Sequence, residues 1–279
     1  MALSAYNGVP LPDFMYGTAW KKEETSRLVE RAVSAGFTAI DTANQLRHYD
    51  EARVGEALLA LRKKGVPREK LFLQTKFTSA GGQDHRTPYD RDADLATQVR
   101  QSFESSLSHL HTDVLDSYVL HGPHFRRGLA AEDWEVWGAI EEIHRSGKAR
   151  IVGVSNVSPE QLALFCREAA VKPMVVQNRC FASLGWDREA RAICRDQGVV
   201  YQGFSLLTAN PEVLADPGFR DLARRHGATP EQVVFRFAQQ AGMLPLTGTT
   251  SERHMKEDLE ASRFSLSEDE VRAIEAVAG

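Results

Sequence analysis

The chain has 279 residues, 42% of them hydrophobic, and its net charge at pH 7 is −4. This length suits one large α/β domain, and the absence of a basic surplus argues against a nucleic-acid partner. No apolar run approaches the roughly 18 residues of a membrane helix, and the N-terminus does not resemble a signal peptide, so we expect a cytoplasmic protein with no membrane partner.

Short apolar runs alternate with helix-like segments along the chain. Each run is nearly continuous in apolar residues, as is typical of a strand that is buried on both faces. Three of the intervening helices should begin with capping boxes, at Ser158–Gln161, Thr229–Gln232 and Ser267–Glu270. The expected strands are Phe14–Thr18, Phe37–Asp41, Leu71–Lys76, Leu115–His121, Arg150–Ser155, Met174–Gln177, Val199–Phe204 and Leu244–Thr247.

This alternation predicts an α/β fold of the (β/α)8 TIM-barrel type, forming a single domain over residues 1–279. A doubly wound open sheet is the competing fold, but it usually carries a G-x-G-x-x-G turn, which does not occur here. Asn7-Gly8 predicts a short N-terminal hairpin, and the box at Ser267–Glu270 predicts an extra C-terminal helix. We interpret the long loop from Thr78 to Asp94 as a candidate lid.

Three polar side chains stand at the ends of consecutive expected strands: Asp41, Lys76 and His121. The ends of parallel barrel strands meet at one mouth, so these residues should converge there. A buried lysine needs a partner, which Asp41 can supply, and the cation can stabilise a nearby phenolate. Tyr49 lies in the loop after Asp41, where it can act as a general acid, while His121 holds a carbonyl oxygen. The group suits protonation of an oxygen while hydride reaches the carbon.

Several segments resemble one known family, the aldo-keto reductases, over nearly the whole chain. The segments that carry the resemblance are Gly36–Ala43, Thr75-Lys76, Leu115–His121, Gly153–Asn156, Gln177 and Gly203–Leu207. The resemblance implies an NAD(P)H-dependent oxidoreductase that reduces an aldehyde, ketone or related C=O or C=N compound. It also implies that Tyr49 is the general acid, that Lys76 lowers its pKa, that Asp41 pairs with Lys76 and that His121 orients the substrate.

The resemblance further implies which residues bind the cofactor and the substrate. NADPH or NADH is expected, and NADP is favoured although Leu246 replaces a lysine that meets the 2′-phosphate in the family. Trp20, His48, His124 and Phe125 are expected to line the substrate pocket. The expected cofactor residues are Ser155, Asn156, Gln177, Phe204, Ser205, Leu207, Thr247, Gly248, Thr249, Arg253, Glu257 and Asp258.

The position of the proton donor is the main departure from the family. The family tyrosine follows the aspartate by five residues, where this chain has Leu46, and alignment from Glu51 places His48 there instead. Tyr49 is our prediction, His48 is the alternative acid, and a chain without a working acid would be a non-catalytic cofactor-binding module. A metal-dependent barrel hydrolase would need more ligands than Asp41 and His121, so no metal is expected. The expected partner is a small carbonyl substrate, and we expect a monomer.

Overall fold

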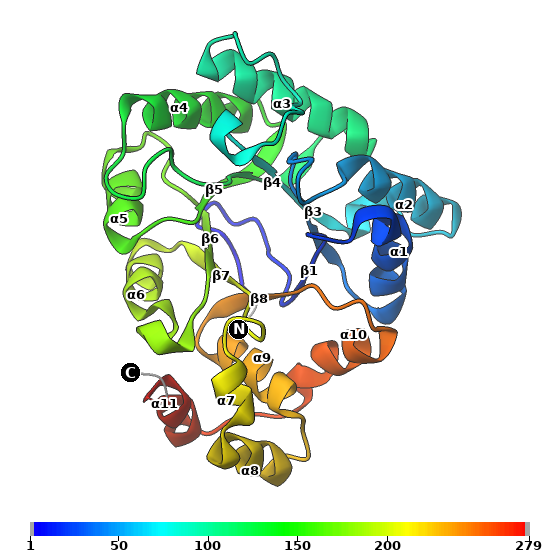
Figure 1. Ribbon diagram of the computed structural model, residues 1–279, viewed down its shortest axis with the longest axis vertical. Helices are drawn as coiled ribbons and strands as arrows, with labels where there is room; N and C mark the ends of the chain where they lie inside the picture. The colour runs from blue at the N-terminus through cyan, green and yellow to red at the C-terminus, as the bar shows by residue number, and fades with distance from the viewer. Residues whose placement is uncertain (1–2, 277–279) are drawn as a thin grey trace.

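The computed structural model describes residues 3–276, and its eight parallel strands form a closed barrel. Each strand pairs with the next one along the chain, and β8 pairs with β1 through Tyr16 and Thr247. Figure 1 shows the ring of strands enclosed by helices. The predicted barrel fold is therefore confirmed, and all eight expected strands are present. They are β1 (Met15–Gly17), β2 (Ala39–Asp41), β3 (Phe72–Phe77), β4 (Leu115–Leu120), β5 (Ala149–Ser155), β6 (Val175–Arg179), β7 (Val200–Phe204) and β8 (Met243–Thr247).

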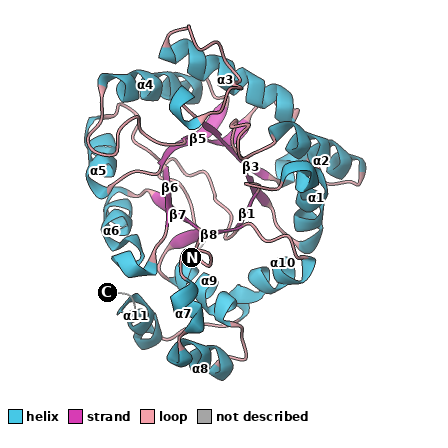
Figure 2. Cartoon of the chain, in the orientation of Figure 1, coloured by secondary structure: helices cyan, strands magenta, loops and turns pink. Residues whose placement is uncertain are grey.

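Helices cover the outside of the barrel, as Figure 2 shows by colour. The capping boxes expected at Ser158 and Thr229 begin two of them, with reciprocal side-chain and backbone bonds. Among the described residues, no helix has both the length and the apolar character needed to cross a membrane. The helices are α1 (Thr25–Ala35), α2 (Glu51–Lys63), α3 (Leu95–Leu110), α4 (Ala131–Arg145), α5 (Pro159–Glu168), α6 (Arg188–Gln197), α7 (Pro211–Ala215), α8 (Pro217–Arg225), α9 (Pro230–Gln240), α10 (Glu252–Leu259) and α11 (Glu268–Ala276).

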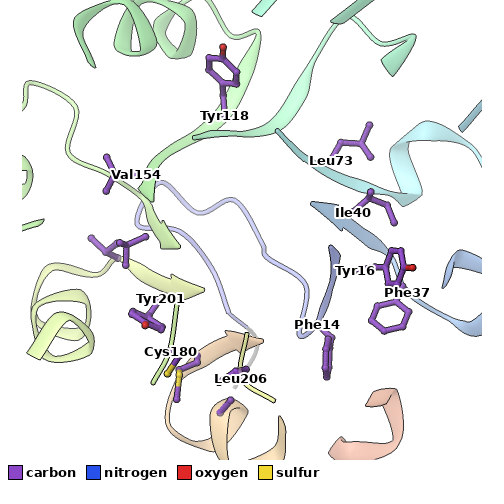
Figure 3. Packing of buried hydrophobic residues seen from close by; sticks show 14 of the residues in the cluster. Phe14, Tyr16, Phe37, Ile40, Leu73, Tyr118, Val154, Cys180, Tyr201 and Leu206 are labelled. Atoms are coloured by element: carbon purple, nitrogen blue, oxygen red, sulfur yellow. The ribbon is translucent and has the colours of Figure 1, made fainter. Parts of the chain in front are cut away.

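The larger hydrophobic core lies between the strands and the helices. Figure 3 shows Tyr16, Ile40 and Tyr118 pointing outward from their strands. The ring of Tyr118 meets that of Phe103 on α3 edge to face, with centroids 4.9 Å apart. Where α2 approaches α3 the backbones touch, because a Cβ on Gly55 would lie 1.8 Å from the carbonyl oxygen of His109. This packing holds the helices against the barrel and fixes the strand ends that form its mouth.

A second, smaller core fills the barrel interior and is closed from below by the N-terminal segment. The hairpin expected at Asn7-Gly8 is present: Ser4 pairs with Pro10, and Gly8 takes a φ of +85°. Ala5 and Leu11 from this segment are buried against interior side chains of the strands. The opposite end, where the strands finish, is the open one.

The extra C-terminal helix is also present as α11. Trp186, fully buried after β6, donates from its indole nitrogen to the carbonyl oxygen of Ile274 in this helix, at 3.1 Å. This hydrogen bond shows an anchor that ties α11 to the segment between β6 and α6.

Candidate active site at the barrel mouth

A cavity of about 750 Å³ opens at the carboxyl ends of the strands. Parallel barrels build their sites at this end, because the strand termini and the following loops converge there. Most of the expected site residues line it. They are Trp20, Asp41, His48, Tyr49, His121, Ser155, Asn156, Gln177, Phe204, Ser205, Leu207, Thr247, Gly248, Thr249, Arg253, Glu257 and Asp258.

Lys76 lies just beneath this lining and is fully buried. Its ammonium donates to both carboxylate oxygens of Asp41, at 2.7 and 2.8 Å, and to the carbonyl oxygen of Thr42 at 2.7 Å. These three bonds use every proton of the ammonium group. Burial lowers the pKa of Lys76, and the adjacent carboxylate of Asp41 opposes that shift. The expected pairing of the two residues is present as a buried, fully hydrogen-bonded ion pair.

Tyr49 reaches the same point in spite of its unusual spacing from Asp41. Its ring centroid is 5.3 Å from the Lys76 ammonium and 5.9 Å from the ring centroid of His121. Burial, and secondarily the negative charge of Asp41, raise the pKa of the Tyr49 phenol above its usual value. This direction is opposite to the lowering that the family resemblance implied. The phenol therefore holds its proton at neutral pH, which is the form that a general acid requires.

His48, the alternative acid, turns to the rim of the cavity. Its ring stacks on the indole of Trp20 at a centroid distance of 4.0 Å, and the two backbones are joined by a 2.7 Å bond from Trp20 N–H to the His48 carbonyl oxygen. Partial burial and the neighbouring Arg47 lower the pKa of His48. The stacked pair forms a wall of the cavity, as expected for both residues.

His121 is held in a neutral form, and one of its ring nitrogens contacts a partner that we did not predict. Burial, then the charge of Lys76, lower its pKa to about 3. Its Nδ1 lies 2.7 Å from the hydroxyl of Thr78, directly after β3. If the hydroxyl donates, Nε2 carries the ring proton and can donate to an oxygen in the cavity. A hydroxyl residue immediately after a barrel strand was the signal available in the sequence.

The other side of the mouth carries amide and hydroxyl groups from β5 and β6. The hydroxyl of Ser155 donates to the carbonyl oxygen of Gln177 at 2.7 Å. Asn156 takes a left-handed φ of 55°, and its amide nitrogen donates to the carbonyl oxygen of His121 at 2.8 Å. The side-chain nitrogen of Gln177 donates to Asp41 at 3.1 Å. The amide oxygens of Asn156 and Gln177 form no hydrogen bond within residues 3–276, so they can accept from a bound group.

Two cations at the mouth were absent from the sequence-based site. Arg179, at the end of β6, places its guanidinium 5.6 Å from the ring centroid of Phe204. Lys21, after β1, donates to the carbonyl oxygen of Gly248 across the cavity and lines it. Within residues 3–276, neither cation has a carboxylate within 4 Å. Arg179 ends a strand and Lys21 follows one, but the neighbouring sequence does not reveal how far either side chain reaches.

The far end of the cavity is acidic. Asp258 is buried and accepts a 2.8 Å bond from the hydroxyl of Thr247. Burial is the main reason that the pKa of Asp258 is raised to about 7, and the nearby charges of Glu257 and Glu231 act in the same direction. Arg253 is largely exposed and lies 3.3 Å from Glu257.

The structure does not bring His124 or Phe125 into the cavity, in contrast to our expectation. The backbone N–H of His124 donates to the buried carboxylate of Asp133 at the start of α4, and its Nδ1 lies 2.8 Å from the same oxygen. Gln161 bonds the carbonyl oxygen of Phe125 at 2.9 Å. These contacts hold the loop after β4 against α4 and α5.

The loop from Thr78 to Asp94 also differs from its interpretation as a lid. None of the described residues that line the cavity belongs to it. Instead it holds the loop that carries Tyr49. Gln83 donates to the carbonyl oxygen of Asn44 and Arg86 to that of Leu46, each at 2.8 Å. Gln45 donates in return to the carbonyl oxygen of Gly82 at 2.8 Å.

Across residues 3–276, no group of three or more His, Cys, Asp or Glu side chains is arranged to hold a metal ion.

Comparison with known proteins bears on these features. The model of the Aldo/keto reductase family matches residues 14–278. The chain is 30% identical to the uncharacterized oxidoreductase YtbE of Bacillus subtilis (strain 168), covering 98% of this chain and 91% of that protein. It is 28% identical to the glyoxal reductase of the same organism, with the same coverage of both chains.

Solved structures agree in fold. The aldo-keto reductase MGS-M4 from a Medee basin deep-sea metagenome library superposes with a TM-score of 0.85 at 21% identity, covering 99% of this chain and 94% of that one. An aldo/keto reductase from Brucella melitensis gives a TM-score of 0.83 at 24% identity, covering 99% and 98%. With a family match over nearly its full length, the chain belongs to the aldo/keto reductase family, whose members are oxidoreductases that act on carbonyl compounds.

Proposed function

We propose that this protein is an NAD(P)H-dependent reductase of aldehydes, ketones or related C=O or C=N compounds, with Tyr49 as its general acid. The observation that carries the proposal is the position of the Tyr49 ring, 5.3 Å from the Lys76 ammonium and 5.9 Å from the His121 ring. A protonated phenol, a buried cation and a neutral imidazole together suit an oxygen that gains negative charge during reaction.

The roles of the residues follow from their protonation states. The neutral His121 donates from Nε2 to the substrate oxygen and holds it near the phenol. Tyr49 then transfers its proton to that oxygen as charge develops there. The resulting phenolate lies beside the ammonium of Lys76, which favours the charged form of the tyrosine. Asp41 keeps Lys76 in place and protonated, and solvent returns the proton to Tyr49.

The residues on the other side of the mouth fit a nicotinamide cofactor. When bound, the cofactor supplies hydride to the carbonyl carbon. The free amide oxygens of Asn156 and Gln177 suit its carboxamide, and the exposed face of Phe204 suits stacking. The backbone of Gly248 and Thr249, together with Lys21, suits the phosphates, because α10 begins shortly after them and a helix N-terminus favours anions.

We further propose that NADPH is bound more tightly than NADH, through Arg253. This arginine is 75% exposed, and its ion pair with Glu257 is therefore weak and easily replaced by a phosphate. The substrate enters beside the stacked rings of Trp20 and His48, which form the wall above Tyr49 and His121.

The general-acid role is tested by replacing the two candidate acids separately. Tyr49→Phe should lower kcat by about 10²–10⁴-fold, the usual contribution of a general acid, with little change in cofactor affinity. His48→Ala should retain most of the turnover and change KM instead. A fully active Tyr49→Phe protein beside an inactive His48→Ala protein would assign the acid to His48. Cofactor binding without turnover of any carbonyl compound would favour a non-catalytic binding module.

A further inference from the structure

Three buried glutamines lie at or beneath the floor of the cavity and bridge opposite walls of the barrel. Gln74 on β3 is in register with Asp41 on β2, and Gln177 on β6 is in register with Gln202 on β7. Gln74 and Gln202 are 0% exposed, and Gln177 is 3% exposed. A buried amide is costly unless its donors and acceptors are satisfied, so the hydrogen bonds of this group can be counted one by one.

Gln202 is the centre of the group. Its Oε1 accepts from the side-chain nitrogens of Gln74, at 2.7 Å, and of Gln177, at 3.0 Å. Its own nitrogen donates to Oε1 of Gln74 at 2.9 Å. The nitrogens of Gln74 and Gln177 also donate to the same carboxylate oxygen of Asp41, at 2.8 and 3.1 Å. Each of these two amide nitrogens thus uses both of its protons.

The charge of Asp41 determines how every amide in the group is oriented. A carboxylate paired with a lysine only accepts hydrogen bonds, so Gln74 and Gln177 must turn their nitrogens toward Asp41. The remaining proton of each amide nitrogen then points at Gln202, which must accept both protons with its Oε1. As a result, the amide oxygen of Gln177 faces the cavity. If Gln202 could not accept, one proton of Gln177 would lose its partner, and the 3.1 Å bond to Asp41 would be left to hold the amide in this orientation.

We propose that Gln202, supported by Gln74, is a positioning residue that acts with Asp41 to fix which end of the Gln177 amide faces the cofactor. The same bonds tie Gln177 to the Asp41–Lys76 pair, so the group that binds the nicotinamide and the group that serves the proton donor share one rigid network. This inference rests on the proposed function, because it assumes that Gln177 holds the carboxamide of the cofactor.

Cofactor affinity tests the inference without any turnover. Gln202→Met keeps the length of the side chain but removes its hydrogen bonds. NADPH titrations followed by fluorescence quenching should show a Kd about fivefold higher, as expected when Gln177 loses one neutral hydrogen bond to the cofactor. In the Gln177→Ala background the same substitution should change Kd by less than about twofold, because the amide that Gln202 orients is gone.

A second variant gives a signature that a purely structural role would not produce. In Gln202→Glu, the carboxyl can accept from Gln177 in either protonation state, although only the protonated form also donates to Gln74 and the ionised form repels Asp41. NADPH affinity of Gln202→Glu should therefore match wild type at low pH and stay above that of Gln202→Met at every pH. Gln98→Met is the matched control, since Gln98 is a buried glutamine that bonds loop carbonyls away from the mouth.

Three results would overturn the inference: unchanged affinity in Gln202→Met, an equal loss with and without Gln177, or a Gln202→Glu protein that binds NADPH no more tightly than Gln202→Met. If neither NADPH nor NADH quenches the fluorescence of the wild-type protein, the proposed function is refuted, and the role of Gln202 with it. Thermal melting of each variant separates these outcomes from unfolding.

Discussion

Replacing Asp258 with asparagine should make the protein more stable, by an amount that grows with pH. The carboxyl is 4% exposed and its pKa is raised to about 7, mainly by burial. In the unfolded chain an aspartate titrates near 3.9. Between these two values the folded protein keeps a proton that the unfolded chain has lost, so stability falls as pH rises. Above pH 7 both states are ionised and the loss reaches its full value.

The magnitude follows from the separation of the two pKa values. Three units at about 1.4 kcal/mol each give a destabilisation of about 4 kcal/mol at pH 8, which vanishes below about pH 4. Asparagine retains an oxygen that can accept from Thr247 and cannot ionise. The unfolding free energy of Asp258→Asn should thus exceed that of wild type by an amount that increases steadily between pH 4 and pH 7 and is constant above that range.

Urea unfolding of the cofactor-free protein, followed by tryptophan fluorescence at pH 5, 6, 7 and 8, measures this difference directly. Asp269→Asn is the matched control, because that side chain is 91% exposed and the same chemical change should leave the pH dependence intact. A difference between Asp258→Asn and wild type that stays constant across the series would refute the reasoning. So would a wild-type protein that gains stability at pH 8 relative to the variant.

Three further predictions concern the mouth of the barrel. Arg86→Ala should lower kcat severalfold at unchanged cofactor Kd, since Arg86 holds the loop that carries Tyr49. Arg91→Ala is the control, because the Arg91 side chain donates to the carbonyl oxygen of Asp84 in its own loop, and equal effects of the two substitutions in steady-state assays would contradict this reasoning. Arg253→Ala should weaken NADPH binding about tenfold and spare NADH, so parallel losses in quenching titrations would exclude phosphate recognition by Arg253. Thr78→Val should let the His121 ring change tautomer and lower kcat/KM about tenfold, and NMR of the ring nitrogens should show the change.

The positions of the strands could be predicted because each one is buried on both faces. Apolar content alone therefore located β2 and β6 to within a few residues, and strand order placed Asp41 and His121 at one mouth. The capping boxes could be predicted as well, because their hydrogen bonds join residues only three positions apart in the sequence.

The loops could not be predicted in the same way, because long-range contacts decide their shape. The choice between His48 and Tyr49 depends on Gln83 and Arg86, which bond the carbonyls of the preceding residues from another loop. His124 stands three residues after His121, but a carboxylate in the next helix binds it. Neither partner is visible from the local sequence.

Closure of the barrel has a consequence for how the protein folds. Asp41, Lys76 and His121 belong to β2, β3 and β4, whereas Gln177 and Phe204 belong to β6 and β7, and the ring closes only when Tyr16 meets Thr247. Contacts so distant in sequence form slowly, because the entropy cost of closing long loops comes before the contacts that compensate for it. We therefore expect refolding chains to recover helical signal before they can bind NADPH, and a nascent chain to have no complete site until its eighth strand is in place.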